Sequence, residues 1–166
     1  MTSPLRIGIV GLGRLGQRHA QALAFSTRNC VLTAACSPVE AERTYASTEL
    51  GIQQVHARFE DLLASPDVDA VVLVTPTSLH ADQAIAALQA GKHVFVEKPL
   101  ALNLPDCERV LAEAEKHPDL IAMVGFVRRF DPSYRAAQAS IAAGDIGRPF
   151  IVRSQTCDQN DPDGFF

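Results

Sequence analysis

The sequence has no apolar stretch long enough to cross a lipid bilayer. Its longest apolar runs, DAVVLV and HVFV, fall far short of the roughly 20 residues that a membrane-spanning helix needs. The first residues, MTSPLRIGIVGLG, also lack the charged segment, apolar core and cleavage site of a secretory signal peptide. We therefore expect a cytoplasmic protein.

Clustered basic residues and paired cysteines are scarce as well. The net charge is −4, the isoelectric point is near 5.7, and the only dense basic spot is RRF at 128–130, which argues against a nucleic-acid or anionic-membrane surface. The four cysteines lie far apart, without a C-x-x-C pair or paired histidines, so we expect neither a disulfide framework nor a metal site. Cys36 ends an apolar run and is expected to be an inert buried thiol.

What the sequence does contain is a regular alternation of short apolar runs and helical segments. The expected strands lie at 5–10, 30–36, 69–75, 93–97 and 120–126, the last being counted as the sixth strand. Helical patterns of about 10–15 residues lie between them, which is typical of a parallel sheet with helices on both faces. The continuous rather than alternating apolar character of the strands supports this. The predicted fold class is a doubly wound α/β domain.

Capping residues predict where two of the helices begin. In SPVEAERTYASTEL, Ser37 is expected as the N-cap, Pro38 as the first helical residue and Gly51 as the stop signal. In NLPDCERVLAEAEKH, the helix is expected to begin at Asn103 or Leu104, just before a proline.

The regular alternation of expected strands and helices ends at residue 126. One more amphipathic helix is expected within 131–147, and residues 148–159 alternate apolar and polar side chains as a half-exposed strand does. A single strand cannot form an independent sheet. We therefore expect one complete domain at 1–126 and only the start of a second α/β domain at 127–166.

Three glycines, Gly11, Gly13 and Gly16, form the pattern G-x-G-x-x-G between the first expected strand and its helix. Here the first glycine permits a tight turn, the second lets a pyrophosphate approach the backbone, and the third allows close helix–strand packing. Arg14 and Leu15, between the second and third glycines, are further candidate contacts. The pattern also fits a plain turn or another nucleotide, but at this junction it favours a Rossmann fold that binds NAD(P).

The end of the second expected strand bears on the choice of dinucleotide. NAD-binding domains usually carry Asp or Glu there to bind the ribose 2′-hydroxyl, whereas this sequence has Cys36 and Ser37 and no acid before Glu40. A neutral Ser37 removes a charge that would repel a 2′-phosphate, and Arg43 could reach that phosphate. Alternatively, Ser37 is only an N-cap and Arg43 only a surface charge. We expect NADP or NAD, with NADP favoured, and we expect Ser37→Asp to shift preference toward NADH.

Polar segments follow three expected strands at their carboxyl ends, where parallel α/β sheets bind ligands. They are TPTSLH at 75–80, EKP at 97–99 and GFVRRF at 125–130. Lys98 is therefore expected to face the cofactor crevice, where an ammonium could stabilise a developing alkoxide or move a proton. Glu97 could orient or pair with that ammonium. The alternative is an ordinary surface ion pair.

Three segments, GIVGLGRLG, TPTSLHADQAIAALQAGKHVFVEKPLALN and VGFVRRFDPSYRAA, resemble the Gfo/Idh/MocA family of oxidoreductases, and the inositol 2-dehydrogenase branch in particular. The resemblance covers nearly the whole chain, and E-K-P after T-P-x-x-x-H is its specific part. It implies an N-terminal Rossmann domain followed by a mainly antiparallel α/β domain that binds a polyol or sugar. It also implies hydride transfer between a secondary alcohol carbon and nicotinamide C4.

The same resemblance implies roles for individual residues. It places Lys98 at the reacting substrate, makes a cis Lys98–Pro99 bond possible, and lets Arg128 reach the substrate. It also places three residues beside the nicotinamide: Thr75, Pro76 and His80. Alternatively, His80 closes the first turn of a helix, and Arg128 and Arg129 form a solvated pair. The other histidines, including His19, are interpreted as structural or exposed.

The family reaction also needs an Asp-x-x-x-His pair from the second domain, whose histidine acts as acid and base. No such pair follows residue 126, so we expect an inactive N-terminal fragment of a polyol or sugar dehydrogenase that forms homo-oligomers through its C-terminal region. The alternative is a non-catalytic dinucleotide-binding or regulatory module, in which the apolar face around RPFIVR and GFF needs a partner. Lys98 favours the enzyme, because a pure binding module needs no lysine at this place.

Overall fold

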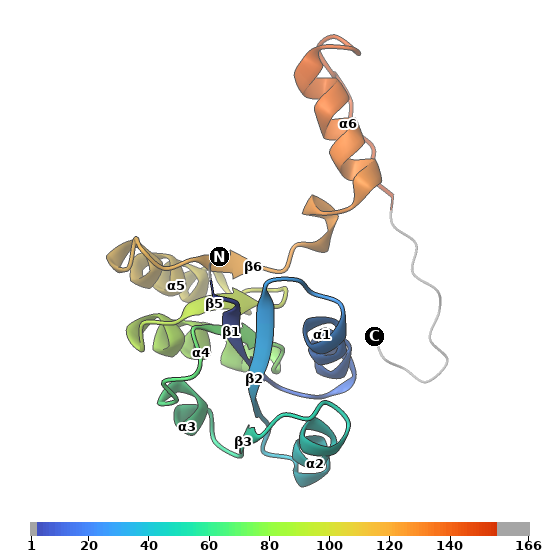
Figure 1. Ribbon diagram of the computed structural model, residues 1–166. Helices are drawn as coiled ribbons and strands as arrows, with labels where there is room; N and C mark the ends of the chain where they lie inside the picture. Colours follow the sequence, from blue (N-terminus) through green and yellow to red (C-terminus); the bar gives the residue numbers. More distant parts are fainter. Residues whose placement is uncertain (1–2, 156–166) are drawn as a thin grey trace. The chain divides into compact units, whose positions relative to one another are not determined.

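Six short apolar segments pair side by side as one parallel sheet in the computed structural model (Figure 1). The strands are β1 (Leu5–Val10), β2 (Cys30–Cys36), β3 (Gln54–His56), β4 (Ala70–Leu73), β5 (His93–Val96) and β6 (Ala122–Val124). Their order is β3-β2-β1-β4-β5-β6, which is the strand order of a doubly wound Rossmann fold. The predicted fold class is confirmed.

Helices cover both faces of this sheet (Figure 1). They are α1 (Arg14–Phe25), α2 (Glu40–Thr48), α3 (Phe59–Leu63), α4 (Thr77–Gln89) and α5 (Leu104–Lys116). In β4, Val71 and Leu73 share a hydrophobic cluster with residues of α3, α4 and α5, whereas Ala70 and Val72 share one with residues of α1 and α2. Burial on both faces explains why this strand is a continuous apolar run.

The structure describes residues 3–155, which form two compact units, one up to Phe126 and one from Val127. The second unit contains the short 3-10 helix η1 (Val127–Arg129) and α6 (Pro132–Ala143). Residues 148–155 form no strand, so the strand predicted over 148–159 is wrong for this part, and residues 156–159 lie outside the described residues. No helix within 3–155 is both long and apolar enough to cross a membrane.

Helix α5 begins where its capping residues predict. The side chain of Asn103, the N-cap residue, accepts a hydrogen bond from the backbone N–H of Asp106 at 2.9 Å, and Pro105 lies in the first turn. Both features are local in sequence, and the prediction is confirmed.

Helix α2, in contrast, begins later than predicted. Its N-cap residue is Val39 and its first helical residue is Glu40, so Ser37 is not the N-cap and Pro38 is not helical. Instead, the Ser37 hydroxyl accepts a hydrogen bond from the Val39 N–H at 3.1 Å and donates one to Glu42 Oε2 at 2.6 Å. The hydroxyl stabilises a turn that precedes the helix.

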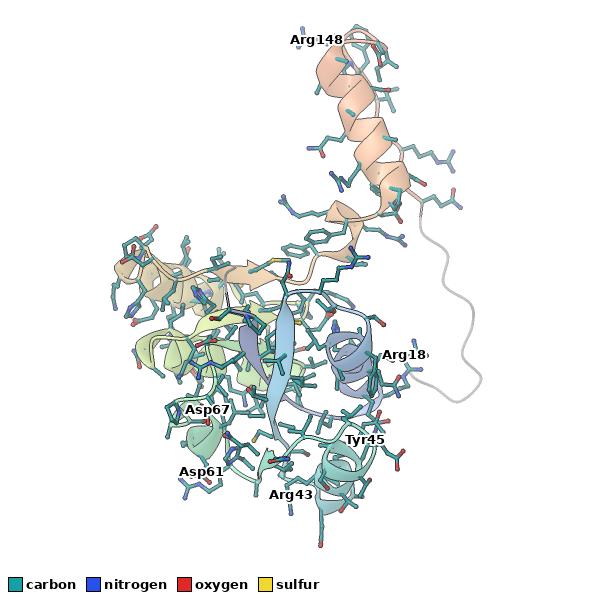
Figure 2. The ribbon with its side chains drawn as sticks, viewed as in Figure 1. Arg18, Arg43, Tyr45, Asp61, Asp67 and Arg148 are labelled. Atoms are coloured by element: carbon teal, nitrogen blue, oxygen red, sulfur yellow. The ribbon has the colours of Figure 1, made fainter. Side chains whose placement is uncertain are left out.

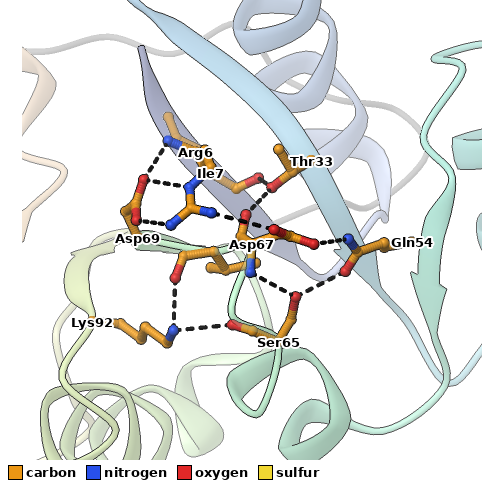
Figure 3. Close-up of polar contacts among 9 residues, drawn as sticks. Arg6, Ile7, Thr33, Gln54, Ser65, Asp67, Asp69 and Lys92 are labelled. Carbon is orange, nitrogen blue, oxygen red and sulfur yellow. Dashed lines mark hydrogen bonds and ion pairs between the residues drawn. The ribbon is translucent and has the colours of Figure 1, made fainter. Parts of the chain in front are cut away.

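A polar network joins the amino ends of β1 and β4 (Figure 3). Asp69 accepts three hydrogen bonds from Arg6, through the backbone N at 2.9 Å, Nε at 3.0 Å and Nη2 at 2.6 Å. Lys92 Nζ donates to two carbonyl oxygens of the loop before β4 at 3.1 and 2.7 Å. These contacts fix the edge of the sheet that lies opposite the carboxyl ends of the strands.

Candidate active site

The carboxyl ends of four strands lie side by side, which brings the predicted site segments to one edge of the sheet. Val10 pairs with Cys36 on one side and with Leu73 on the other, and Leu73 pairs with Val96. The glycine turn after β1, the turn after β2, the loop after β4 and the E-K-P segment after β5 are therefore neighbours.

The turn between β1 and α1 needs glycine at two positions because a Cβ there would clash with backbone atoms. Gly11 has φ of +86°, and a Cβ there would lie 2.6 Å from the carbonyl oxygen of Val74. A Cβ on the buried Gly16 would collide with the carbonyl oxygen of Gly11. The turn can therefore pack against α1 and against the end of β4 only with glycine at both positions.

Gly13 is different, because the space in front of it is open. It is the N-cap residue of α1 with an ordinary φ of −64°, and a Cβ there would have one neighbour within 4 Å, Glu42 Oε1 at 3.9 Å. The first turn of α1, with the exposed Arg14 and Leu15, contains no acidic side chain that would compete with an anion for the helix N-terminus. An open backbone before a helix N-terminus fits the pyrophosphate of a dinucleotide.

At the end of β2 the structure places a carboxylate that sequence reasoning missed. Glu42 Oε2 accepts hydrogen bonds from the Ser37 hydroxyl at 2.6 Å and from the Leu12 N–H at 3.3 Å. Arg43, labelled in Figure 2, donates through Nη1 to the carbonyl oxygen of Ser37 at 2.8 Å. Ser37 itself is only 1% exposed, so it contacts these neighbours rather than the open space. The available signal was an acidic residue in the first turn of the following helix.

Cys36, the last residue of β2, is buried as predicted. Burial, helped by the nearby carboxylates of Glu60 and Asp61, raises the pKa of its thiol to about 11. The thiol is therefore protonated and unreactive at neutral pH. Within residues 3–155 there is no group of three or more side chains that could hold a metal ion.

The loop after β4 contains Thr75 and Pro76, and His80 lies one turn further into α4. The Thr75 hydroxyl donates to Gln83 Oε1 at 2.6 Å, and Pro76 is the N-cap residue of α4. His80 is 1% exposed, and its ring bridges two backbone carbonyl oxygens, those of Pro99 and Thr75, each at 2.8 Å. His80 thus ties the loop after β4 to the E-K-P segment, and its predicted contact with the cofactor stays a prediction.

The E-K-P segment follows β5, and its Lys98–Pro99 peptide bond is cis, as the resemblance allowed. Lys98 is exposed, and its ammonium has no hydrogen-bond or ion-pair partner within residues 3–155. Glu97 does not pair with this ammonium: Oε2 accepts from the Lys98 backbone N–H and Oε1 contacts His19 Nε2, both at 2.9 Å. His19, interpreted from the sequence as structural or exposed, therefore links α1 to the lysine segment.

Arg128 belongs to the second unit. Its Nη1 donates to Asp131 at 3.2 Å, and its guanidinium carbon lies 5.4 Å from the centre of the Tyr134 ring. Hydrogen bonds from the backbone N–H groups of Tyr134 and Ser133, together with Arg128, lower the pKa of Asp131. The predicted contact between Arg128 and a substrate stays a prediction.

Together, the strand order and the open glycine turn define a Rossmann domain of the dinucleotide-binding type. Residues 5–126 match the family model described as "Oxidoreductase family, NAD-binding Rossmann fold". The chain belongs to this family, Gfo/Idh/MocA.

Relatives of this chain include inositol dehydrogenases. The scyllo-inositol 2-dehydrogenase (NAD(+)) of Bacillus subtilis is 40% identical over 166 residues, which are 100% of this chain and 48% of the relative. The myo-inositol 2-dehydrogenase of Thermotoga maritima is 37% identical, over 95% of this chain and 47% of the relative. A crystal structure of scyllo-inositol dehydrogenase from Lactobacillus casei with NAD(H) and scyllo-inositol has a TM-score of 0.84 at 44% identity, over 87% of this chain and 42% of that one. The chain spans about half the length of the curated relatives it matches.

Proposed function

We propose that this chain supplies the cofactor site and the catalytic lysine of an NAD(P)-dependent oxidoreductase that acts on a secondary alcohol of a polyol or sugar. The observation that carries the proposal is the position of Lys98, which follows β5 at the edge of the sheet where the glycine turn lies. Its side chain is exposed, and its ammonium has no hydrogen-bond or ion-pair partner within residues 3–155. The names of the relatives, which are inositol dehydrogenases, support a cyclic polyol as the substrate class.

In the oxidative direction a secondary alcohol becomes a ketone: the C–H bond breaks with its electron pair, and the hydroxyl proton leaves to a base. When bound, the nicotinamide supplies the acceptor for that hydride, or the donor in the reverse direction. The Lys98 ammonium donates a hydrogen bond to the alcohol oxygen and stabilises the negative charge that develops there as the proton departs. A cation placed in advance at this oxygen acts mainly on the transition state, and so on kcat.

The surrounding residues hold Lys98 from its backbone and leave its ammonium available. Glu97 accepts from the Lys98 backbone N–H and is fixed in turn by His19. His80 bonds to the carbonyl oxygen of Pro99. Residues of α1 and α4 therefore fix the backbone on both sides of Lys98 at the end of β5, which supports the placement of this lysine for catalysis.

The choice between NAD and NADP depends on two side chains near Ser37. The preference for NADP predicted from the sequence relied on a neutral Ser37 and on Arg43 as a phosphate ligand. Arg43 does lie next to Ser37, but its Nη1 donates a hydrogen bond to the Ser37 carbonyl oxygen. Glu42 adds a carboxylate that accepts a hydrogen bond from the Ser37 hydroxyl. That carboxylate favours NAD. A cytoplasmic location and a homo-oligomer formed through the C-terminal region remain predictions.

The test uses the natural polypeptide that contains this chain, assayed with myo- and scyllo-inositol and either NAD⁺ or NADP⁺. Lys98→Ala is expected to lower kcat by about 10²–10³-fold with the Kd for the reduced cofactor changed less than about threefold. Lys116→Ala, an exposed lysine paired with Glu113 on α5, is the control and should leave kcat unchanged.

Unchanged turnover in Lys98→Ala removes this lysine from the mechanism. Cofactor binding without turnover of any polyol or sugar favours the alternative, a dinucleotide-binding module that does not catalyse.

A further inference from the structure

The carboxyl end of β2 lies against the glycine turn. The Gly11 N–H donates to the carbonyl oxygen of Cys36 at 2.9 Å, and the next residue, Ser37, is 1% exposed. In NAD-binding Rossmann domains an acidic side chain at this strand end accepts a hydrogen bond from the adenosine ribose. Here the strand end is neutral and buried, so that position supplies no carboxylate.

A carboxylate reaches the same place from the first turn of α2. Glu42 Oε2 is held by two donors, the Ser37 hydroxyl at 2.6 Å and the Leu12 N–H at 3.3 Å. Its other oxygen, Oε1, makes no hydrogen bond within residues 3–155 and lies 3.9 Å from where a Cβ on Gly13 would be. One oxygen is thus fixed by the protein, and the other faces the open space before the glycine turn.

We propose that Glu42 is the residue that selects NAD(H) against NADP(H), and that Ser37 is its positioning residue. This inference rests on the proposed function, since it requires a dinucleotide at the glycine turn. Glu42 Oε1 accepts a hydrogen bond from a ribose hydroxyl of NAD(H), a bond strengthened by the charge of the carboxylate. A 2′-phosphate would weaken the binding of NADP(H) in two ways. Its negative charge repels the Glu42 carboxylate, and it replaces the ribose hydroxyl that would donate the hydrogen bond.

Arg43 does not reverse this preference. Its Nη1 is bonded to the Ser37 carbonyl oxygen at 2.8 Å, and its side chain borders a hollow together with Glu40, Thr44, Ser47 and Val55. To bind a 2′-phosphate, Arg43 would have to give up that bond or share it, and the phosphate would still face Glu42. The carboxylate is already in place next to the glycine turn, whereas the guanidinium would have to move.

The experiment measures the Kd values of NADH and NADPH separately, by nicotinamide fluorescence or calorimetry, on the natural polypeptide that contains this chain. Glu42→Gln keeps the shape and an acceptor oxygen but removes the charge. The ratio of the NADPH Kd to the NADH Kd, which is expected to exceed 1 in the native protein, should fall by about tenfold or more. Glu40→Gln, an exposed carboxylate in the same helical turn, is the matched control and should leave the ratio within about twofold.

Ser37→Ala provides a second variant in case Glu42→Gln does not fold. It removes the hydroxyl that holds Glu42 Oε2 but keeps the charge, so the ratio should fall in the same direction by a smaller factor. A ratio that is the same in native protein and in Glu42→Gln overturns the inference, as does a native protein that prefers NADPH. If the native protein binds neither dinucleotide, the proposed function itself is refuted, and this result is distinct from binding without selection.

Discussion

Asp69 allows a quantitative test of how the amino ends of the strands are held together. Its two carboxylate oxygens accept three hydrogen bonds from Arg6, at 2.9, 3.0 and 2.6 Å, across 63 residues of sequence (Figure 3). Hydrogen bonds from the Arg6 side chain, followed by the one from its backbone, lower the pKa of Asp69 from 3.8 to about 2. The perturbation is Asp69→Asn, which keeps the volume of the side chain and removes the charge.

The size of the effect follows from these bonds and from their exposure. The amide places an NH₂ group where one carboxylate oxygen now accepts, so at least one bond to Arg6 is lost and the others are no longer charge-assisted. Because the Asp69 side chain is 34% exposed and that of Arg6 40% exposed, solvent screens much of the ion pair. We expect the free energy of unfolding to fall by about 1–2 kcal/mol, and the melting temperature to fall by roughly 5 °C.

The loss should also depend on pH in a defined direction. The pKa of Asp69 is lower in the folded state, so its contribution to stability is complete above the unfolded-state pKa and is lost as pH falls through the folded-state value, from about pH 5 toward about pH 2. Urea denaturation at pH 7 and at several values below pH 4 measures the difference between native protein and Asp69→Asn. The exposed Asp119→Asn is the control. A difference below about 0.5 kcal/mol at pH 7, or one that stays constant down to pH 2, would refute this reasoning.

Three further substitutions separate binding from folding. Gly13→Ala adds a methyl group in open space at an ordinary φ, so the free energy of unfolding measured by calorimetry should change by less than about 1 kcal/mol. The Kd for a dinucleotide should rise by about tenfold or more. An unchanged Kd contradicts the proposed pyrophosphate contact. Gly16→Ala drives a Cβ into the carbonyl oxygen of Gly11, so it should cost several kcal/mol or prevent folding, and a stable variant contradicts the close packing. Leu88→Ala, at a fully buried position of α4, should cost about 2–5 kcal/mol in urea denaturation, and a loss below about 1 kcal/mol means that the core repacks around the cavity.

The sheet and the glycine turn could be predicted because their signals are local. The ranges 5–10 and 30–36 match β1 and β2 because each is a short, mostly apolar segment followed directly by turn-forming residues, the glycine turn after β1 and Ser37-Pro38 after β2. The start of α5 was predicted for a similar reason, since Asn103 caps a helix that begins one residue later. In each case the residues that decide the structure are within a few positions of one another.

β3 and the start of α2 could not be located in this way. β3 contains only three residues, all partly buried, at one edge of the sheet, so it has too few apolar positions to show a period. Ser37 is a good N-cap residue by type, yet its hydroxyl bonds to Val39 and Glu42 and the helix begins at Glu40. Propensity predicted Ser37 as the N-cap residue, which is wrong, because propensity could not choose among the possible hydrogen-bond partners of its hydroxyl.

The polar contacts that shape the site join residues that no spacing rule connects. His19 and Glu97 are 78 residues apart, Leu12 and Glu42 are 30 apart, and His80 meets the carbonyl oxygen of Pro99 across 19. Two of these contacts occupy a group to which sequence reasoning gave another role: Glu97 was expected to act on the Lys98 ammonium, and His80 on the cofactor.

These contacts determine which groups remain available for chemistry. Because Glu97 is held by His19 and by the Lys98 backbone N–H, it makes no ion pair with the Lys98 ammonium in the described part of the chain. Because Ser37 and the Leu12 N–H hold Oε2 of Glu42, its Oε1 is turned toward the glycine turn. In both places hydrogen bonds hold a carboxylate or one of its oxygens and leave another polar group available: the ammonium of Lys98 and Oε1 of Glu42. The acidic residue that a Rossmann domain usually carries at the end of β2 can therefore lie on the following helix instead, as we propose for Glu42. The condition is that the fold places its carboxylate beside the glycine turn.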